Sequence, residues 1–247
     1  MKSKIASLVT VPLFLLGGIA HADLSAALAS EDRAAADRAR DAGRKPAEVV
    51  AFLGIGPGMT VMDLIAAGGY YTEVMSLAVG AEGKVYAQNP PRVLQFRDGA
   101  NEKALSARLA DGRLPNVERV NQQDLGATGI APGSLDAAIT ALNFHDLYNG
   151  QGPEAAAGFL AGVRALLKPG GVLGLVDHYG DPAQDNASLH RLDVAAAMPV
   201  LEAAGFEIES SDLLRNADDD HTTRVFDAAI RGKTDRVLYK LTKPVVE

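Results

Sequence analysis

The sequence predicts an α/β protein built on an open, doubly wound and mostly parallel sheet of seven strands. Two observations support this prediction. Short apolar runs of strand length recur along the chain, and Ala/Leu-rich stretches of helical period separate most of them. Strands that are apolar along nearly their whole length indicate a sheet covered on both faces, and right-handed helical crossovers make neighbouring strands parallel. The strands are expected at residues 60–65, 84–88, 116–120, 135–141, 171–177, 206–210 and 236–242.

Helices are expected before, between and after these strands. Residues 24–43 are rich in Ala, Arg and Asp, which favours an amphipathic helix that ends at Gly43. A shorter helix begins at Pro46, because proline suits the first helical turn. Residues 211–235 are polar and acidic, and they are compatible with a helix, a loop or a lid. Within the sheet domain, helices are predicted at residues 72–79, 92–110, 153–168 and 188–204.

The first 22 residues have the three parts of a secretory signal peptide. Two lysines precede an almost wholly apolar run at residues 5–20, and Ala20-His21-Ala22 places small residues at a cleavage site. An uncleaved membrane anchor is the alternative, but this apolar run is shorter than the roughly 20 residues that cross a bilayer. We therefore expect cleavage after Ala22 and a periplasmic or secreted protein.

Three segments are expected along the chain. They are a signal peptide at residues 1–22, an N-terminal helical extension at residues 23–54 and a single α/β domain at residues 55–247. No internal repeat and no long linker divides the domain further. Its size is sufficient for an ordinary hydrophobic core.

Charge and cysteine content restrict the partners and the chemistry. The chain has 24 basic and 31 acidic residues, and loss of the two lysines in the signal peptide changes the formal charge from −7 to −9. An acidic surface repels phosphate backbones and anionic lipid headgroups, so we expect neither nucleic acid nor a membrane as a partner. The chain has no cysteine, which excludes disulfides, thiolate catalysis and thiolate metal sites.

The first predicted strand leads into a turn of small residues, Ala66-Ala67-Gly68-Gly69, and then into a helix. Such a turn lets a ligand approach the backbone closely, and ligands of open α/β sheets bind beyond the carboxyl ends of the strands. A tight connection that uses glycine for its geometry alone is an equally good interpretation of the turn by itself. Because isoleucine is β-branched and stiff, we expect Ile65 to avoid positive φ and to continue the strand.

Two motifs in this order resemble the class I S-adenosylmethionine-dependent methyltransferases. The first extends from Lys45 to Thr72 and includes the turn, and the second is Leu166-Leu167-Lys168-Pro169-Gly170-Gly171, similar to that family's helix, turn and fifth strand. The resemblance covers about residues 45–243. It implies a Rossmann-like fold and an enzyme that transfers a methyl group from S-adenosylmethionine to a small-molecule nucleophile. Together with the signal peptide, the chain resembles predicted exported bacterial methyltransferases.

The resemblance also implies residues that bind the cofactor. The family's first motif has an acid followed by glycines at the second, fourth and sixth positions after it. Asp63 matches the acid and Gly69 the last glycine, whereas Ile65 and Ala67 replace the first two glycines. The family usually has a ribose-binding acid after the second strand and an acid that contacts adenine after the third. These positions hold an amide and an acid here, which gives the predicted cofactor-binding set Asp63, Ala67, Gly68, Gly69, Asn89 and Asp124.

Two His/Asp pairs follow the fourth and fifth predicted strands. They are His145-Asp146 and Asp177-His178, and neighbouring strands would bring both to the same rim of the sheet. In the family this rim holds acid/base and substrate-positioning residues, so we predict His145, Asp146 and His178 as catalytic, with His145 the first choice of base. The alternative is that the two aspartates cap helices and the histidines lie in polar loops.

Two other functions are compatible with the sequence. Ile65 in place of a glycine favours a non-catalytic protein that has lost the cofactor and binds another small ligand in the same cleft. A metal-dependent hydrolase is the second alternative, because three of the four histidines of the mature chain adjoin an aspartate. No two have the i, i+4 spacing of a helix-borne site, so no metal ligand is predicted. These four are His145, His178, His190 and His221.

Two charged runs near the C-terminus have simpler interpretations. The acidic run at residues 218–220 is expected to be a solvated loop, because it lacks the spacing of a calcium loop. The basic run at residues 231–236 is expected to form the turn into the last strand, with neutralisation of an acidic substrate as the alternative.

Overall fold

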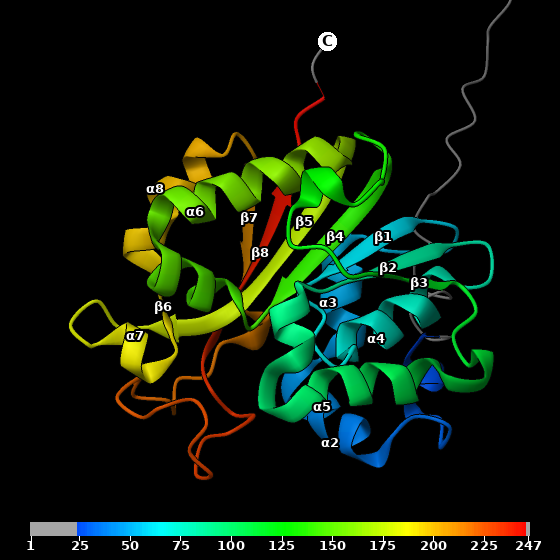
Figure 1. The fold of residues 1–247 in the computed structure, drawn as a ribbon. Coiled ribbons are helices and arrows are strands. Elements are labelled where there is room, and N and C mark those ends of the chain that lie inside the picture. The colour runs from blue at the N-terminus through cyan, green and yellow to red at the C-terminus, as the bar shows by residue number, and fades with distance from the viewer. Residues whose placement is uncertain (1–23, 246–247) are drawn as a thin grey trace, which may run out of the picture.

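A twisted sheet with helices on both faces forms the body of the computed structural model, which describes residues 24–245 (Figure 1). The predicted signal peptide lies outside these residues. The strand order is β3-β2-β1-β4-β5-β8-β7, with the short β6 paired to β5. The strands are β1 (Thr60–Leu64), β2 (Lys84–Gln88), β3 (Val117–Val120), β4 (Leu135–Ala141), β5 (Leu167–Gly180), β6 (Leu192–Asp193), β7 (Glu207–Ser211) and β8 (Arg236–Thr242).

The pairing of the strands confirms the predicted doubly wound, mostly parallel sheet. β1 pairs in parallel with both β2 and β4, and β2–β3 and β4–β5 are parallel as well. Among the described strands, only β8 runs against its neighbours β5 and β7, and β3 and β7 are the outermost. The chain order reverses between β1 and β4, which is where ligands bind in sheets of this kind.

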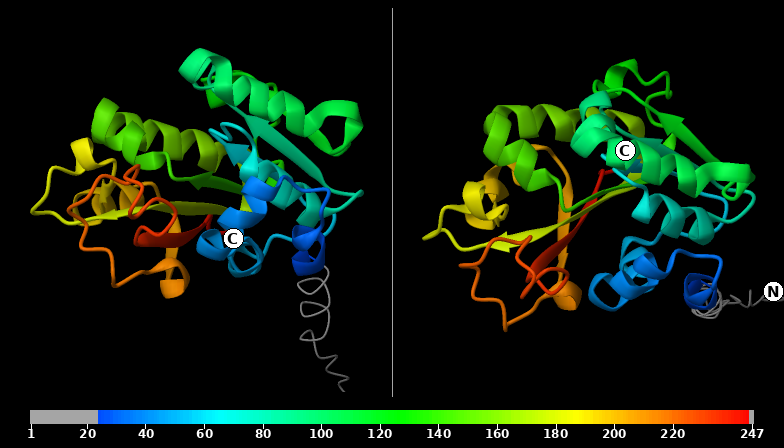
Figure 2. Two further views of the ribbon diagram at one scale, coloured as in Figure 1. Left: turned by 90° about the horizontal axis from the view of Figure 1, so that it is seen from below. Right: turned by 60° about the horizontal axis from the view of Figure 1, so that its bottom comes forward.

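Helices cover both faces of the sheet, and Figure 2 shows α6 and the N-terminal helices on opposite sides. Successive residues of a strand point to opposite faces, so Val61 packs towards α3 and α4 whereas Met62 packs towards α6 and α8. The helices are α2 (Ala35–Arg44), α3 (Pro46–Leu53), α4 (Tyr70–Val79), α5 (Pro91–Leu109), α6 (Phe144–Leu166), α7 (Asn186–Leu189) and α8 (Val194–Ala203). Short 3-10 turns are η1 (Ala110–Gly112), η2 (Leu125–Ala127) and η3 (Asp212–Leu214).

Three of the predicted helices are interrupted in the structure, and one of them is α5, in which residues 96–99 leave the helical conformation. Residues 24–29 and α2 are separate helices, because the Ser30 hydroxyl accepts a hydrogen bond from the Asp32 amide and competes with the helical pattern. The helix predicted at residues 188–204 is wrong in its first half. There the chain forms the end of α7 and then β6, and α8 begins only where Asp193 caps it by accepting from the Ala196 amide at 2.9 Å.

Residues 211–235 form an extended, irregular segment that a buried ion pair attaches to the body. Arg191 and Asp219 make a two-pronged salt bridge with both N–O distances at 2.9 Å, and their side chains are 0% and 2% exposed. Our expectation of a wholly solvated acidic run is therefore wrong at Asp219, although Asp218 and Asp220 are exposed. Arg191 also donates to the carbonyl oxygens of Tyr179 and Thr223, which fixes the segment beside β5.

The N-terminal helices belong to the same hydrophobic core as the sheet. Leu24 and Leu28 are buried in one cluster with residues of α3 and α4. Within residues 24–245, no helix combines the length and the apolar character needed to span a membrane.

Candidate functional site

A cleft of about 2040 Å³ lies at the carboxyl ends of the parallel strands. The β1–α4 turn, α5, the start of α6 and the end of the 211–235 segment form its walls. Gly69 and Asn89 do not line it. The other predicted site residues do, namely Asp63, Ala67, Gly68, Asp124, His145, Asp146 and His178.

The β1–α4 turn corrects our expectation for Ile65. The strand ends at Leu64, and Ile65 has a φ of +54°, in the left-handed region that isoleucine disfavours. Its neighbours hold it there, because the Ile65 amide donates to Gln88 Oε1 at 3.0 Å and the Ala66 amide donates to the Gln88 carbonyl oxygen at 2.9 Å. The Ile65 side chain is half-buried and lines the cleft.

Left-handed conformations recur at every second residue of this turn. Ile65, Ala67 and Gly69 have φ values of +54°, +50° and +81°. These are the three positions at which the resemblance places glycines. The backbone thus has the shape of a glycine-rich turn although two of its glycines are absent.

Two polar side chains at the end of β2 fasten the turn. Asn89 is fully buried, with its Oδ1 accepting from the Ala67 amide at 2.8 Å and its Nδ2 donating to the Ala67 carbonyl oxygen at 3.4 Å. Gln88 bridges the Ile65 amide and the Gln122 carbonyl oxygen in the same way. Asn89 therefore supports the turn in this structure, and its contact with a cofactor ribose stays a prediction.

Close packing of α5 explains the two glycines that remain. A Cβ atom at Gly68 would lie 3.0 Å from the Ala104 Cβ, and one at Gly69 would lie 2.8 Å from a Leu105 methyl carbon. Arg108, on the same helix, donates from Nε to the Gly68 carbonyl oxygen at 2.9 Å. Its guanidinium also pairs with Asp37 of α2 and Glu73 of α4, so one side chain joins three helices to the turn.

The two predicted acids of the cofactor site differ in environment. Asp63 is buried beneath the turn and accepts a hydrogen bond from the Thr72 hydroxyl at 2.6 Å. Burial raises the pKa of Asp63 to about 7, although the Thr72 hydrogen bonds and the Arg108 and Arg44 charges oppose this rise. Asp124 is exposed on the rim, where it caps η2 by accepting from the Gly126 amide at 2.8 Å.

The structure brings the two predicted His/Asp pairs together at the rim. The His145 ring lies 5.8 Å from the His178 ring, centroid to centroid. Asp177, which we had not placed among the site residues, accepts from the His145 amide at 2.6 Å and lies 2.7 Å from His145 Nδ1. One carboxylate of β5 thus caps the start of α6 and orients the first histidine of that helix.

The two histidines have opposite protonation preferences. Burial alone would lower the pKa of His145, but the carboxylates of Asp177 and Asp146 outweigh it and raise this pKa to about 10. Burial, followed by the charges of Arg236 and His145, lowers the pKa of His178 well below its ordinary value. His178 Nδ1 is hydrogen-bonded to the Thr234 hydroxyl at 2.8 Å. The surroundings therefore favour the protonated form of His145 and the neutral form of His178.

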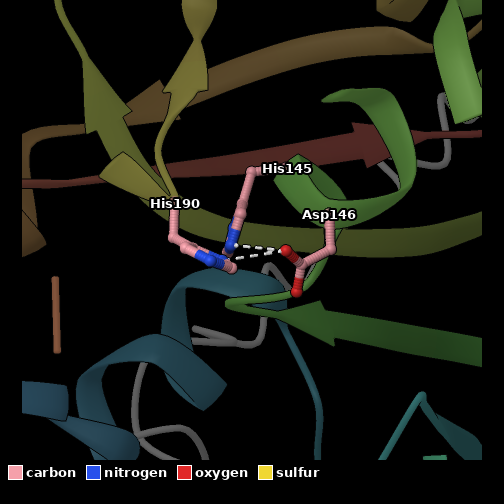
Figure 3. A group of neighbouring side chains, drawn as sticks. All are labelled: His145, Asp146 and His190. Carbon is pink, nitrogen blue, oxygen red and sulfur yellow. Dashed lines mark hydrogen bonds and ion pairs between the residues drawn. The ribbon is translucent and has the colours of Figure 1, made fainter. Parts of the chain in front are cut away.

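A third histidine joins this group from a distant part of the chain (Figure 3). His190, which follows α7, has its Nδ1 3.1 Å from Asp146 Oδ1, and its ring centroid lies 5.7 Å from that of His145. Arg224 and Phe226 of the 211–235 segment contact the other side of the ring. No site was expected at His190 from the sequence, because 44 positions separate it from Asp146.

Two arginines in the cleft were not predicted as site residues. Arg236 is 3% exposed and donates to the Thr234 hydroxyl and the Gly43 carbonyl oxygen, and the Arg44 guanidinium lies 4.3 Å from the centre of the Tyr70 ring. Neither forms an ion pair with a carboxylate among residues 24–245. Burial, then the charge of Arg44, lowers the pKa of Arg236. An anionic group on a ligand would compensate these two charges.

The fold is similar to those of solved methyltransferases. An S-adenosylmethionine-dependent methyltransferase from Aquifex aeolicus superposes with a TM-score of 0.59 at 20% identity over 80% of this chain and 89% of that chain. An S-adenosylmethionine-dependent O-methyltransferase from Thermotoga maritima gives 0.55 at 16% identity, over 83% and 66% of the two chains. A protein described as a possible exported protein from Bordetella parapertussis gives 0.53 at 15% identity, over 82% and 68%.

No family model and no curated protein sequence matches the chain. The structural similarities show that it has the fold of the class I methyltransferases, and they confirm the fold expected from the two sequence motifs.

Proposed function

We propose that the protein transfers a methyl group from S-adenosylmethionine to a small-molecule nucleophile. The observation that carries this proposal is the shape of the β1–α4 turn, with positive φ at Ile65, Ala67 and Gly69. A non-glycine residue in the left-handed region costs roughly 1–2 kcal/mol. Strain of this kind persists where the surrounding structure imposes it, and it gathers at ligand sites. In this turn Gln88, Asn89 and Arg108 impose it.

The residues of the cleft fit the cofactor. The turn at Ala67 and Gly68 lines the cleft at the point where the strand order reverses, and Asp124 lies on the rim within the same cleft. A volume of about 2040 Å³ exceeds the roughly 300–1,000 Å³ of common small-molecule sites, so cofactor and substrate can be held together. When bound, S-adenosylmethionine supplies an electrophilic methyl group, and the protein contributes chiefly by positioning the two reactants.

His178 is the residue we propose as the proton acceptor for the nucleophile. Its Nδ1 is fixed by Thr234, its side chain lines the cleft, and its Nε2 has no hydrogen-bond partner among residues 24–245. His145, our first choice from sequence, is held between the carboxylates of Asp177 and Asp146, which favour its protonated form and make it a poorer proton acceptor. We therefore prefer His178 to His145 as the base within the predicted set.

Calorimetric titration with S-adenosylhomocysteine tests the cofactor site. We expect wild-type protein to bind this ligand and Asp124→Ala to bind it more weakly by about 1–3 kcal/mol, the scale of a hydrogen bond to a charged group. Asp218→Ala is the matched control, because Asp218 is exposed and does not line the cleft. Absence of binding by wild-type protein at millimolar ligand would overturn the proposal.

A non-catalytic protein that binds another small ligand is the second candidate. The Ile65 side chain occupies part of the cleft surface that a glycine would leave free, and Asn89 is engaged by the turn. If wild-type protein fails to bind S-adenosylhomocysteine although the cleft is intact, this second function is the one supported.

A further inference from the structure

Three metal-ligating side chains converge on a point beside the cleft, and two of them line it. His145, Asp146 and His190 each offer one ligand atom, and these atoms all lie within 4.8 Å of one another (Figure 3). The first two come from the start of α6, and the third follows α7. We infer that these three residues form a binding site for a divalent transition-metal ion. This inference does not depend on the proposed methyl transfer.

His145 gives the independent observation that points to a ligand. The residue is 2% exposed, and its Nε2 is buried without a hydrogen-bond partner. Asp146 Oδ1 lies 3.3 Å from this nitrogen but not in hydrogen-bond geometry. A buried polar atom without a partner is costly and rare in folded proteins. A metal ion between the two side chains would give Nε2 the partner that it lacks.

The surroundings of His145 are those of a metal ligand. Its Nδ1 lies 2.7 Å from Asp177 Oδ1, which fixes the ring and directs Nε2 towards Asp146. Histidines that bind metals usually donate their other ring nitrogen to a carboxylate or carbonyl group in this way. The Asp177 side chain is completely buried and also accepts from the His145 amide, so the orientation of the ring is set by two bonds.

Asp146 and His190 complete the group on its open side. The Asp146 side chain is 60% exposed, and the two histidines are its only ionic partners among residues 24–245. His190 is held against the Phe226 ring at 4.9 Å between centroids, with its Nδ1 towards Asp146. Both His145 and Asp146 line the cleft. Three protein ligands with remaining positions open to a cleft are typical of metal sites that also bind a substrate or water.

The donor set selects the class of ion. Two imidazole nitrogens and one carboxylate oxygen suit Zn²⁺ and also Mn²⁺ or Fe²⁺, whereas Ca²⁺ and Mg²⁺ prefer sites made of oxygen alone. The imidazole nitrogens bind as lone pairs, so any proton on them passes to solvent when the ion binds.

Arg224 affects the affinity of this site for a metal ion through its hydrogen bond to His190. Its guanidinium donates to His190 Nε2 at 3.0 Å, which leaves the proton of a neutral ring on Nδ1. A metal ion at Nδ1 requires that proton on Nε2, where it would face the Arg224 donor. Arg224 is exposed, so its guanidinium can turn to solvent, but it competes with the ion. Removal of Arg224 should therefore strengthen metal binding.

Zn²⁺ titration of the chelator-treated full chain, followed by calorimetry and elemental analysis after dialysis, tests the site. We expect one Zn²⁺ per chain, an affinity at least tenfold lower in both Asp146→Ala and His190→Ala, and a higher affinity in Arg224→Ala. The matched control is His221→Gln, because His221 also lies beside an aspartate, Asp235 at 3.0 Å, but outside the group. Circular dichroism establishes that each variant is folded.

Three results would overturn the inference. These are no stoichiometric Zn²⁺ on wild-type protein, equal losses of affinity in His221→Gln and His190→Ala, and Ca²⁺ binding as tightly as Zn²⁺ at the same residues. The first two would leave the three side chains as a hydrogen-bonded group only, and the third would refute the selection of a transition-metal ion. Because S-adenosylhomocysteine binding is measured separately, failure of the metal site and failure of the cofactor site can be told apart.

Discussion

Ile65 shows how neighbouring side chains can determine the conformation of a single residue. Isoleucine by itself favours extended backbone, which is why the sequence predicted a longer strand. In the structure, Gln88 and the rest of the turn hold it at a φ of +54°. The sequence signal for this outcome was the glycine that the resembled family has at this position, and the preference of isoleucine for extended backbone outweighed it in our prediction.

Replacement of Ile65 by glycine should relieve this strain and open the cleft. We expect Ile65→Gly to bind S-adenosylhomocysteine more tightly than wild type. Relief of roughly 1–2 kcal/mol in the folded state is offset by the greater freedom of glycine in the unfolded chain, so stability should change by less than about 1 kcal/mol. Calorimetry and urea unfolding measure the two effects. A loss of about 2–5 kcal/mol would instead show that the side chain belongs to the core.

Asp63 should make stability depend on pH. Its folded pKa is about 7, above the unfolded value of 3.8, so the folded state binds more protons between these pH values. The stability that this extra proton provides is present below about pH 4 and is lost as pH rises through 7. We expect the unfolding free energy of wild type, relative to Asp63→Asn, to fall between pH 4 and pH 8. Urea unfolding of both proteins across this range measures the difference, and a constant difference would contradict the prediction.

At the scale of elements, the segment at residues 211–235 depends on one buried ion pair. Arg191 and Asp219 are almost fully buried, and Asp219 also accepts from the Asp235 and His221 amides. Breaking such a pair leaves an uncompensated buried charge, so we expect Asp219→Ala to lower the unfolding free energy by about 3–5 kcal/mol. The neighbouring exposed Asp218→Ala should change it by less than about 0.5 kcal/mol. Chemical denaturation compares the two, and equal effects would refute the structural role of the pair.

Sequence patterns located most strands and few of the side-chain contacts. The predicted bounds of β2, β4 and β8 agree with the structure, because apolar runs bounded by turn residues are local signals. The prediction of one helix at residues 188–204 was wrong, because Asp193 caps a new helix inside an apparently continuous helical pattern. Arg191 and Asp219 are 28 positions apart, and His190 and Asp146 are 44 apart. Such pairs depend on how the elements pack, which no short window of sequence contains.

For the whole molecule, we propose export with cleavage after Ala22. Leu24 and Leu28 are buried in the main core, and this cleavage would leave both in place. We expect N-terminal sequencing of protein from the periplasm of a Gram-negative host to begin at Asp23. Soluble cytoplasmic protein that retains Met1 would contradict the proposal. Because S-adenosylmethionine is made in the cytoplasm, an exported enzyme also requires cofactor in its own compartment.

The strand order has a consequence for self-association. Within the part of the chain that the structure describes, β3 and β7 each have one side without a neighbouring strand, and an unpaired strand can template the addition of another chain. Both carry charged residues, with Glu118 and Arg119 in the middle of β3 and Glu207 and Glu209 at the start and in the middle of β7. A second copy added at either margin would have to desolvate these side chains. The sheet is thus protected at both ends against open-ended growth into fibres.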